Sequence, residues 1–190
     1  MKIEETSLSG VRVITPAVYR DSRGAFMETW NQRAMAEAGL PSTWVQDNFS
    51  VSRKNVLRGI HYQVTQPQGK LVRLTHGAAL DVAVDLRRSS PTFGKYFAVE
   101  LDGESGRMLW IPVGFGHAFL VLSDVAGFAY KVTDYYSPAG ERTLLWNDPD
   151  LAIPWPVASE QVLVSDKDQK GAALRDAQVF PSVDAEIYAN

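Results

Sequence analysis

The sequence predicts an all-β fold, a jelly-roll sandwich or barrel with a few short helices. Three observations lead to it: short segments rich in β-branched and aromatic residues recur, clusters of Gly, Pro, Asp and Ser separate them, and only one segment has helical character. Many short strands with turn signals between them are typical of antiparallel sandwiches and barrels. The mouth of such a barrel can hold a small ligand.

The expected strands follow one another as far as about residue 146. They are Val11–Ile14, Phe26–Trp30, Val45–Val51, Val56–Gln63, Lys70–Leu74, Ala78–Leu86, Tyr96–Leu101, Met108–Ile111, His117–Val121, Gly127–Val132 and Thr143–Trp146. The helical segment is Asn31–Gly39, which is rich in Ala, Met and Glu and ends on a glycine C-cap. We expect a single domain over residues 1–190, with a loosely attached tail from about residue 176.

Length and composition narrow the possible functions. The chain has 190 residues, of which 45% are hydrophobic, and this is enough for one continuous core. Its formal net charge of -3 gives no general attraction to nucleic acid or to an anionic membrane. The lack of cysteine excludes disulfides, thiolate catalysis and cysteine-ligated metals.

The sequence also bears on location. The first ten residues contain no apolar stretch typical of a secretory signal, and no segment approaches the roughly 20 apolar residues that span a bilayer. We therefore expect a cytoplasmic protein that binds neither nucleic acid nor membranes.

Histidines are the first candidates for chemistry, because imidazole titrates near neutral pH. His61 lies in a segment where alternation puts Leu57, Gly59 and His61 on one face, with the glycine leaving open space beside the imidazole. His117 starts a strand after a turn. Each histidine could equally be a half-buried structural residue, and the residues alone leave both interpretations open.

A metal-dependent barrel enzyme is the natural alternative, since histidine and carboxylate on barrel strands commonly bind iron, manganese or zinc. Such sites usually have two histidines one residue apart on a strand face. Here the residue two positions beyond His61 is Gln63, which weakens the metal hypothesis.

Other polar side chains on the expected strands have two interpretations each. Lys70 shares a face with apolar residues, so it either reaches solvent or stabilises negative charge. Asp81 and Asp85 share a face and could both be salt-bridge partners. Tyr130 faces away from its neighbour Lys131 and by itself indicates little.

Taken together, the motifs of this chain closely resemble those of the dTDP-4-dehydrorhamnose 3,5-epimerase family, which has a cupin-like fold. They are Asp21–Glu28 (DSRGAFME), Gln46–Ser50 (QDNFS), Leu57–Gln63 (LRGIHYQ), Gln68–Arg73 (QGKLVR), Asp81–Arg87 (DVAVDLR), Ser90–Lys95 (SPTFGK), Ile111–His117 (IPVGFGH), Tyr130–Tyr136 (YKVTDYY) and Ser165–Asp168 (SDKD). The chain departs from the family pattern at a few positions. The family commonly has Leu at position 60 and Glu at position 113, where this chain has Ile60 and Val113. The family has Ala and Gly at the positions of Gly116 and Ala118.

The resemblance implies roles for individual residues. His61 would be the proton acceptor, Asp168 its orienting carboxylate, Tyr130 the proton donor and Lys70 the stabiliser of an enolate. The implied contacts to the nucleotide sugar are Arg23, Glu28, Gln46, Asn48, Arg58, His117, Glu141 and Lys167. Arg23 and Glu28 are expected to reach into the neighbouring site of a homodimer.

The reaction implied is epimerisation of a dTDP-linked 4-keto-6-deoxyhexose at C3 and C5, without metal or organic cofactor, as in dTDP-L-rhamnose biosynthesis. Both carbons flank the keto group, so loss of either proton gives the same kind of enolate. Alternatives that remain open are a 3-only or 5-only epimerase, a metal-dependent cupin, and a sugar-nucleotide binder without catalysis.

Overall fold

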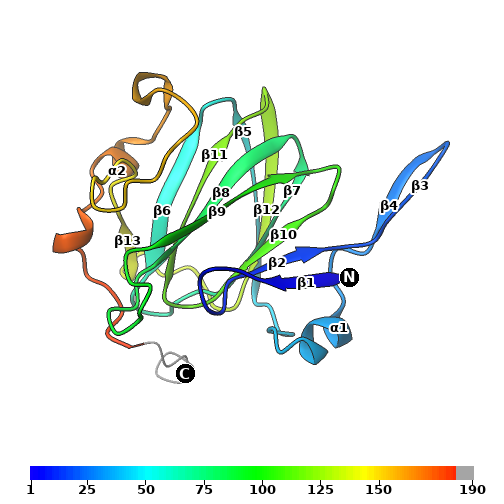
Figure 1. Cartoon of the computed structure of the whole chain (residues 1–190), viewed down its shortest axis with the longest axis horizontal. Helices are drawn as coiled ribbons and strands as arrows, with labels where there is room; N and C mark the ends of the chain where they lie inside the picture. Colours follow the sequence, from blue (N-terminus) through cyan, green and yellow to red (C-terminus); the bar gives the residue numbers. More distant parts are fainter. Residues whose placement is uncertain (183–190) are drawn as a thin grey trace.

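The computed structural model describes residues 1–182 and shows two sheets packed face to face (Figure 1). The six-stranded sheet contains, in spatial order, β1 (Lys2–Glu5), β2 (Arg12–Thr15), β10 (Met108–Ile111), β7 (Lys70–His76), β12 (Val125–Val132) and β5 (Gln46–Arg53). The five-stranded sheet contains β13 (Glu141–Thr143), β6 (Leu57–Gln63), β11 (Phe115–Val121), β8 (Ala78–Asp85) and β9 (Tyr96–Asp102). Neighbouring strands are antiparallel, and the predicted all-β class is confirmed.

The main core lies between the two sheets, where alternate residues of each strand meet. It includes Val72 and Leu74 from β7, Phe119 from β11 and Phe128 from β12. The rings of Phe119 and Phe128 stack with their centroids 4.0 Å apart. This apolar cluster continues to Tyr130, so it forms the floor beneath the polar residues described below.

The outer faces of both sheets are covered by different parts of the chain. The helix α1 (Gln32–Glu37) and the loop after it place Met35 and Leu40 against Trp110 of the six-stranded sheet. Asn31 caps this helix, as its side chain accepts a hydrogen bond from the Ala34 amide. The expected helix is thus confirmed with slightly shorter bounds.

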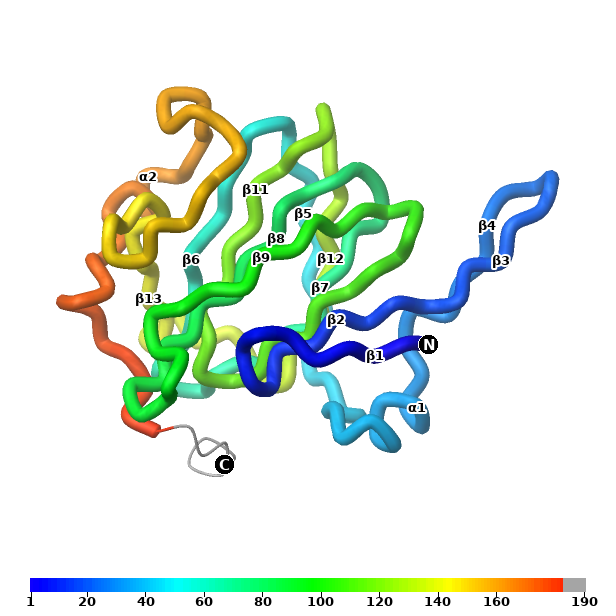
Figure 2. Tube along the Cα trace, viewed as in Figure 1, coloured from blue at the N-terminus to red at the C-terminus, as the bar shows by residue number. Residues whose placement is uncertain are grey.

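The C-terminal third covers the five-stranded sheet, on the left in Figure 2. It contains the helix α2 (Asp166–Gln169) and two short 3₁₀ helices, η1 (Ser159–Gln161) and η2 (Leu174–Asp176). The expectation of a loose tail from about residue 176 needs correction for residues 176–182. Phe180 is 2% exposed, and its backbone pairs with Leu86 and Arg88. Residues 183–190 lie outside the described part.

Several expected strands have different bounds. The last expected strand, Thr143–Trp146, is instead Glu141–Thr143, because Leu144 bridges to Ala172 and the chain then leaves the sheet. Two strands were missed, β1 and β3 (Val18–Asp21), since both are short and mostly exposed and lack a hydrophobic pattern. The expected strand Phe26–Trp30 is displaced to β4 (Gly24–Met27), which pairs with β3.

The β3–β4 hairpin projects away from the sandwich (Figure 1). Tyr19 and Phe26 are cross-strand partners on it and are 66% and 70% exposed. Such a pair of exposed aromatics on a two-stranded ribbon contributes nothing to the core of its own chain.

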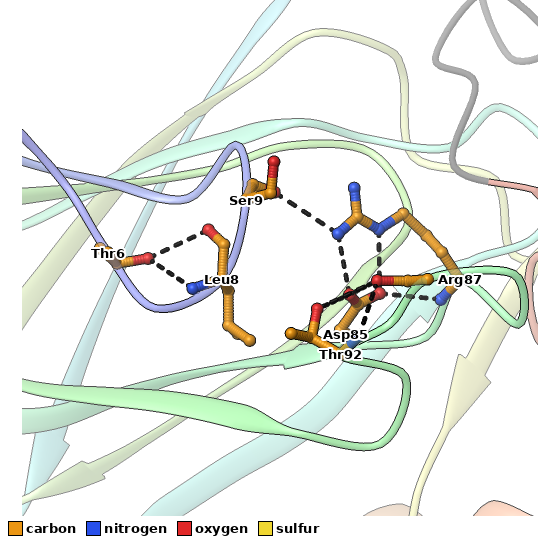
Figure 3. A network of polar contacts seen from close by, with 7 residues as sticks. Thr6, Leu8, Ser9, Asp85, Arg87 and Thr92 are labelled. Carbon is orange, nitrogen blue, oxygen red and sulfur yellow. Dashed lines mark hydrogen bonds and ion pairs between the residues drawn. The ribbon is translucent and has the colours of Figure 1, made fainter.

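A buried polar network fixes the end of β8 to the N-terminal loop (Figure 3). The Asp85 carboxylate accepts hydrogen bonds from the Arg87 guanidinium, from Ser90 and from Thr92, and Arg87 also donates to the backbone oxygen of Ser9. These bonds hold the pKa of Asp85 below its ordinary value although burial alone would raise it. The interpretation of Asp85 as a salt-bridge partner is therefore confirmed.

An irregularity in β6 changes which side chains face the interior. The pairing of β6 with β11 matches His61 to His117 but Arg58 to Phe119, so β6 has one residue more than β11 between these pairs. Gly59 sits at this bulge with φ of +119°. A Cβ at Gly59 would lie 2.5 Å from the His117 carbonyl oxygen, so the open space expected beside His61 is filled by backbone.

Candidate active site

A cavity of about 300 Å³ opens between the two sheets above the aromatic core. Residues from strands of both sheets line it: Asn48, Phe49, Ser50, Arg58, His61, Lys70, His117, Phe119 and Tyr130. Six of these were predicted as site residues from the sequence: Asn48, Arg58, His61, Lys70, His117 and Tyr130. The fold thus gathers residues that are up to 82 positions apart in the chain, from Asn48 to Tyr130.

His61 projects from β6 and is backed by a carboxylate. Its Nε2 lies 2.6 Å from Oδ1 of Asp168, which is 2% exposed in the first turn of α2. Asp168 Oδ2 also accepts a weaker hydrogen bond from the Gly59 amide, at 3.4 Å. Burial alone would raise the pKa of Asp168, but these hydrogen bonds and the charge of His61 outweigh it, so that pKa is lowered.

This contact decides which histidine nitrogen is available. A carboxylate on Nε2 favours the tautomer in which Nε2 carries the proton, leaving the Nδ1 lone pair free to accept another. The side chain of His61 is 27% exposed, so it is accessible from the cavity. The arrangement is suited to a general base.

Tyr130 enters the same cavity from the opposite sheet. It lies on β12, beside Asn48 of β5 and Val72 of β7, while its neighbour Lys131 points outward to pair with Asp47. Burial raises the pKa of the Tyr130 phenol, an effect that Arg58 opposes. The hydroxyl therefore stays protonated at neutral pH and can donate a proton.

A second buried pair lies beside Lys70. His117 is fully packed between the sheets, and its Nε2 contacts both oxygens of Asp81 at 3.2 and 3.0 Å. Burial lowers the pKa of His117 against the opposing effect of Asp81, so this imidazole is neutral. Asp81 is thus the hydrogen-bond partner of a neutral histidine, and its interpretation as a salt-bridge partner is not confirmed.

Lys70 is the lysine that lines the cavity. Burial lowers its pKa to about 8, while the negative charges of Asp81 and Glu141 oppose this change and Lys167 adds to it. The amine thus remains mostly protonated at neutral pH but lies close to losing its charge.

Glu141 and Lys167 form an ion pair of 2.8 Å near the cavity, and Tyr136 donates a hydrogen bond to the same carboxylate. The Tyr136 amide donates to Gln46, whose side chain bonds in turn to Asn48 at 2.8 Å. These contacts join four of the predicted binding residues into one chain of hydrogen bonds. Tyr136 was not singled out from the sequence, because nothing in its local pattern separates it from the exposed Tyr135.

Two predicted binding residues lie elsewhere. Arg23 is at the tip of the β3–β4 hairpin and pairs with Asp21 at 2.6 Å. Glu28 follows the hairpin and accepts a hydrogen bond from Asn31. Within one chain, neither residue contributes to the cavity.

Comparison with known proteins decides the family. The family model described as dTDP-4-dehydrorhamnose 3,5-epimerase matches residues 5–176. A dTDP-4-dehydrorhamnose 3,5-epimerase of Pseudomonas aeruginosa is 51% identical over 182 residues, which cover 95% of this chain and 100% of that protein.

The chain belongs to the dTDP-4-dehydrorhamnose 3,5-epimerase family. This confirms the resemblance inferred from the motifs, and it places the protein among the isomerases.

Solved structures of the family agree with the fold. A 3,5-epimerase of Legionella pneumophila in complex with dTDP-4-keto-L-rhamnose is 46% identical, covers 100% of this chain and 97% of its own, and has a TM-score of 0.89. A 3′-monoepimerase of Streptomyces bikiniensis in complex with dTDP-quinovose is 35% identical, with coverages of 96% and 94% and the same TM-score. Members that act at one centre therefore share this backbone.

The sequence interpretation missed three cavity residues, Phe49, Ser50 and Phe119. Ser50 could have been found, because period-2 alternation along the segment that carries Gln46 and Asn48 puts position 50 on the same face. Phe119 lines the cavity floor and belongs to the core.

The structure also bears on metal binding and on membrane association. Among residues 1–182, no three histidine, cysteine, aspartate or glutamate side chains gather as metal ligands would. In the same part of the chain no helix is long and apolar enough to cross a membrane.

Proposed function

We propose that this protein converts dTDP-4-dehydro-6-deoxy-D-glucose to dTDP-4-dehydro-L-rhamnose by inverting C3 and C5 without a cofactor. The observation that carries the proposal is the placement of His61, backed by Asp168, and of Tyr130 on opposite sheets of one cavity. Family membership supports the same reaction.

Inversion next to a ketone needs two proton carriers. A proton leaves one face of the carbon, the electron pair of the broken C–H bond moves to the C4 oxygen as an enolate, and a proton returns to the other face. His61 Nδ1 takes the first proton, and Asp168 stabilises the imidazolium that forms. Tyr130, on the opposing sheet, returns a proton from its hydroxyl, and exchange with solvent resets both groups.

The enolate needs a positive charge close by. Lys70 lines the cavity and carries that charge in its protonated form. Removing one preorganised donor of this kind usually costs about 3 to 4 kcal/mol of transition-state stabilisation. Asp81, itself paired with His117, helps Lys70 to keep its proton.

The nucleotide part of the substrate carries two phosphates, whereas the chain is acidic overall. Arg58 is the arginine that lines the cavity, and a guanidinium can hold a pyrophosphate by two parallel hydrogen bonds. Gln46, Asn48, Glu141 and Lys167 would contact the remainder of the nucleotide sugar, and the hydrogen bond of Gln46 to Asn48 and the ion pair of Glu141 with Lys167 support this role.

Proton NMR in deuterium oxide tests the reaction directly. The wild-type protein should incorporate deuterium at both C3 and C5 of dTDP-4-dehydro-6-deoxy-D-glucose and give the rhamno product. His61→Ala should abolish exchange at both carbons. His76→Ala is the matched control, since His76 is exposed and does not line the cavity, and it should behave as wild type. A wild-type protein that binds dTDP but exchanges neither carbon would refute the proposal.

A single-centre epimerase is the second candidate, because a 3′-monoepimerase shares this fold at 35% identity. His61, Tyr130, Lys70 and Asp168 would serve either reaction, so the difference would lie in how far the sugar turns between proton transfers. Inversion confined to C3 or to C5 in the same NMR experiment would favour this candidate.

We also infer that the protein is a homodimer whose sites are completed by Arg23 and Glu28 of the neighbouring subunit. The projecting hairpin supports this, because its aromatic residues Tyr19 and Phe26 are largely exposed in the single chain (Figure 1). The outer face of β5 also exposes Phe49 and Val51, which are 59% and 55% exposed. Exposed apolar residues on two such surfaces are typical of a protein interface.

Mixing two inactive variants distinguishes the dimer from a self-contained subunit. Arg23→Ala chains keep His61, and His61→Ala chains keep Arg23. If Arg23 serves the neighbouring site, unfolding and refolding the mixture should restore activity, because each mixed dimer has one complete site. A site built within one chain would stay impaired in every species.

A cytoplasmic location stays a prediction that cell fractionation would test.

A further inference from the structure

The strand β5 presents an all-polar row to the sandwich interior. Its outward positions 47, 49, 51 and 53 are exposed, whereas the inward positions are Gln46, Asn48, Ser50 and Ser52. Inward positions of a sandwich strand are normally apolar. The cavity accounts for three of these four polar residues. Asn48 and Ser50 line it, and Gln46 forms a hydrogen bond with Asn48. Ser52 does not line the cavity, so the presence of a polar residue at this inward position needs another explanation.

Ser52 is 6% exposed, and its hydroxyl has one hydrogen-bond partner in the described part of the chain. Its Oγ accepts from Nε of Arg58 at 3.1 Å. A buried hydroxyl is costly unless bonded, so a purely structural position would favour a small apolar residue here. The bond crosses from β5 of one sheet to β6 of the other.

The contact uses only the inner nitrogen of the guanidinium. Within residues 1–182, the hydrogen bond of Arg58 is made by Nε, and its terminal nitrogens make no hydrogen bond or ion pair. Arg58 lines the cavity, and its positive charge opposes the rise in the pKa of Tyr130, which lines the same cavity. Because the guanidinium is planar, fixing Nε fixes the direction in which both terminal nitrogens point.

We propose that Ser52 is a positioning residue that holds Arg58 ready to bind the pyrophosphate of the nucleotide sugar, an inference that rests on the proposed function. A free arginine side chain must lose rotamer entropy when it binds a ligand. The hydrogen bond to Ser52 already restricts the side chain of Arg58 before the ligand binds, so less rotamer entropy is lost on binding. It also aligns the two terminal nitrogens for a bidentate contact with phosphate oxygens.

A double-mutant cycle on dTDP binding tests the proposal. Isothermal titration with dTDP should show that Ser52→Ala weakens affinity by about fivefold to tenfold, which is within the usual effect of one intramolecular hydrogen bond. In the Arg58→Lys background the same Ser52→Ala change should have no further effect, because lysine keeps the charge but has no Nε to be held. Equal effects in both backgrounds would overturn the proposal.

Kinetics and control variants separate positioning from stability. Ser52→Ala should raise KM while kcat stays within about twofold, because the bond acts on binding of the non-reacting part of the substrate. Ser52→Thr keeps the hydroxyl and should restore most of the affinity. Ser90→Ala, at a buried serine of the Asp85 network, should lower the melting temperature and leave dTDP affinity unchanged. A Ser52→Ala variant with a lower melting temperature but unchanged affinity for dTDP would also overturn the proposal.

These outcomes are independent of catalysis. A wild-type protein that binds dTDP but shows no exchange at C3 or C5 would refute the proposed reaction, while the cycle would still decide the role of Ser52. An active wild type with additive effects in the cycle would refute the role of Ser52 alone. Should Ser52→Ala not fold, Ser52→Cys, which keeps only a weak acceptor, takes its place in the cycle.

Discussion

His61 Nε2 lies 2.6 Å from Asp168 Oδ1, so a strand residue is oriented by a carboxylate that follows it by 107 positions. Ser165 caps the short helix that carries this carboxylate and accepts a hydrogen bond from the Asp168 amide. The geometry of the candidate base therefore depends on a segment outside both sheets.

Replacing Asp168 tests this dependence. Asp168→Asn should lower kcat by about 10²- to 10⁴-fold with a small change in KM, because the amide neither fixes the tautomer nor stabilises the imidazolium. Asp166→Asn, an exposed change in the same turn, is the matched control and should leave kcat unchanged. Steady-state kinetics of both variants, with circular dichroism to confirm folding, make the measurement. An Asp168→Asn variant with wild-type kcat would contradict the assignment.

Tyr130→Phe should separate proton removal from inversion. His61 still abstracts a proton, so deuterium exchange should persist, while inversion should fall by about 10²-fold or more because the donor on the opposite face is missing. Time-resolved NMR in deuterium oxide follows both processes in one sample. Tyr62→Phe is a control at a buried tyrosine that donates to the Gln178 carbonyl outside the cavity. Full epimerisation by Tyr130→Phe would show that another group is the donor.

The pKa of Lys70 predicts how the activity changes at alkaline pH. Burial lowers its pKa to about 8, so the positive charge that stabilises the enolate is present below this pH and is lost as the pH rises through it. Tyr130 does not titrate in this range, because burial raises its pKa. Activity should therefore fall above about pH 8. Lys70→Arg keeps its charge there, and its residual activity should lack this decline; a decline at the same pH in that variant would assign it to another group.

The departures at Ile60 and Gly116 predict a compensating pair. A Cβ at Gly116 would lie 2.6 Å from Cγ2 of Ile60, so Gly116→Ala should lower the free energy of unfolding by about 1 to 3 kcal/mol. Leucine has no branch at Cβ, and adding Ile60→Leu should recover most of this loss. Urea denaturation of the two single variants and the double variant measures the coupling. Strictly additive effects would show that the two positions are independent.

Much of the fold could be predicted because its signals are local. Alternating apolar residues with turn residues between them located most strands, and the Ala-rich segment that ends on Gly39 located α1. The short strands β1 and β3 were missed, since each has few buried residues and so little pattern. The segment after Pro149 looked irregular, yet it docks on the five-stranded sheet through scattered apolar residues such as Leu174 and Phe180.

The sequence by itself determined the family, the chemistry-bearing residue types and the strands of His61, Lys70 and Tyr130, because motifs and alternation are properties of the chain. Tertiary structure decided which of them meet. Strict alternation puts Arg58 and His61 on opposite faces, but the bulge at Gly59 turns both into the cavity. At this bulge β11 approaches so closely that only a residue without a Cβ fits, and this long-range contact is not encoded by any local pattern.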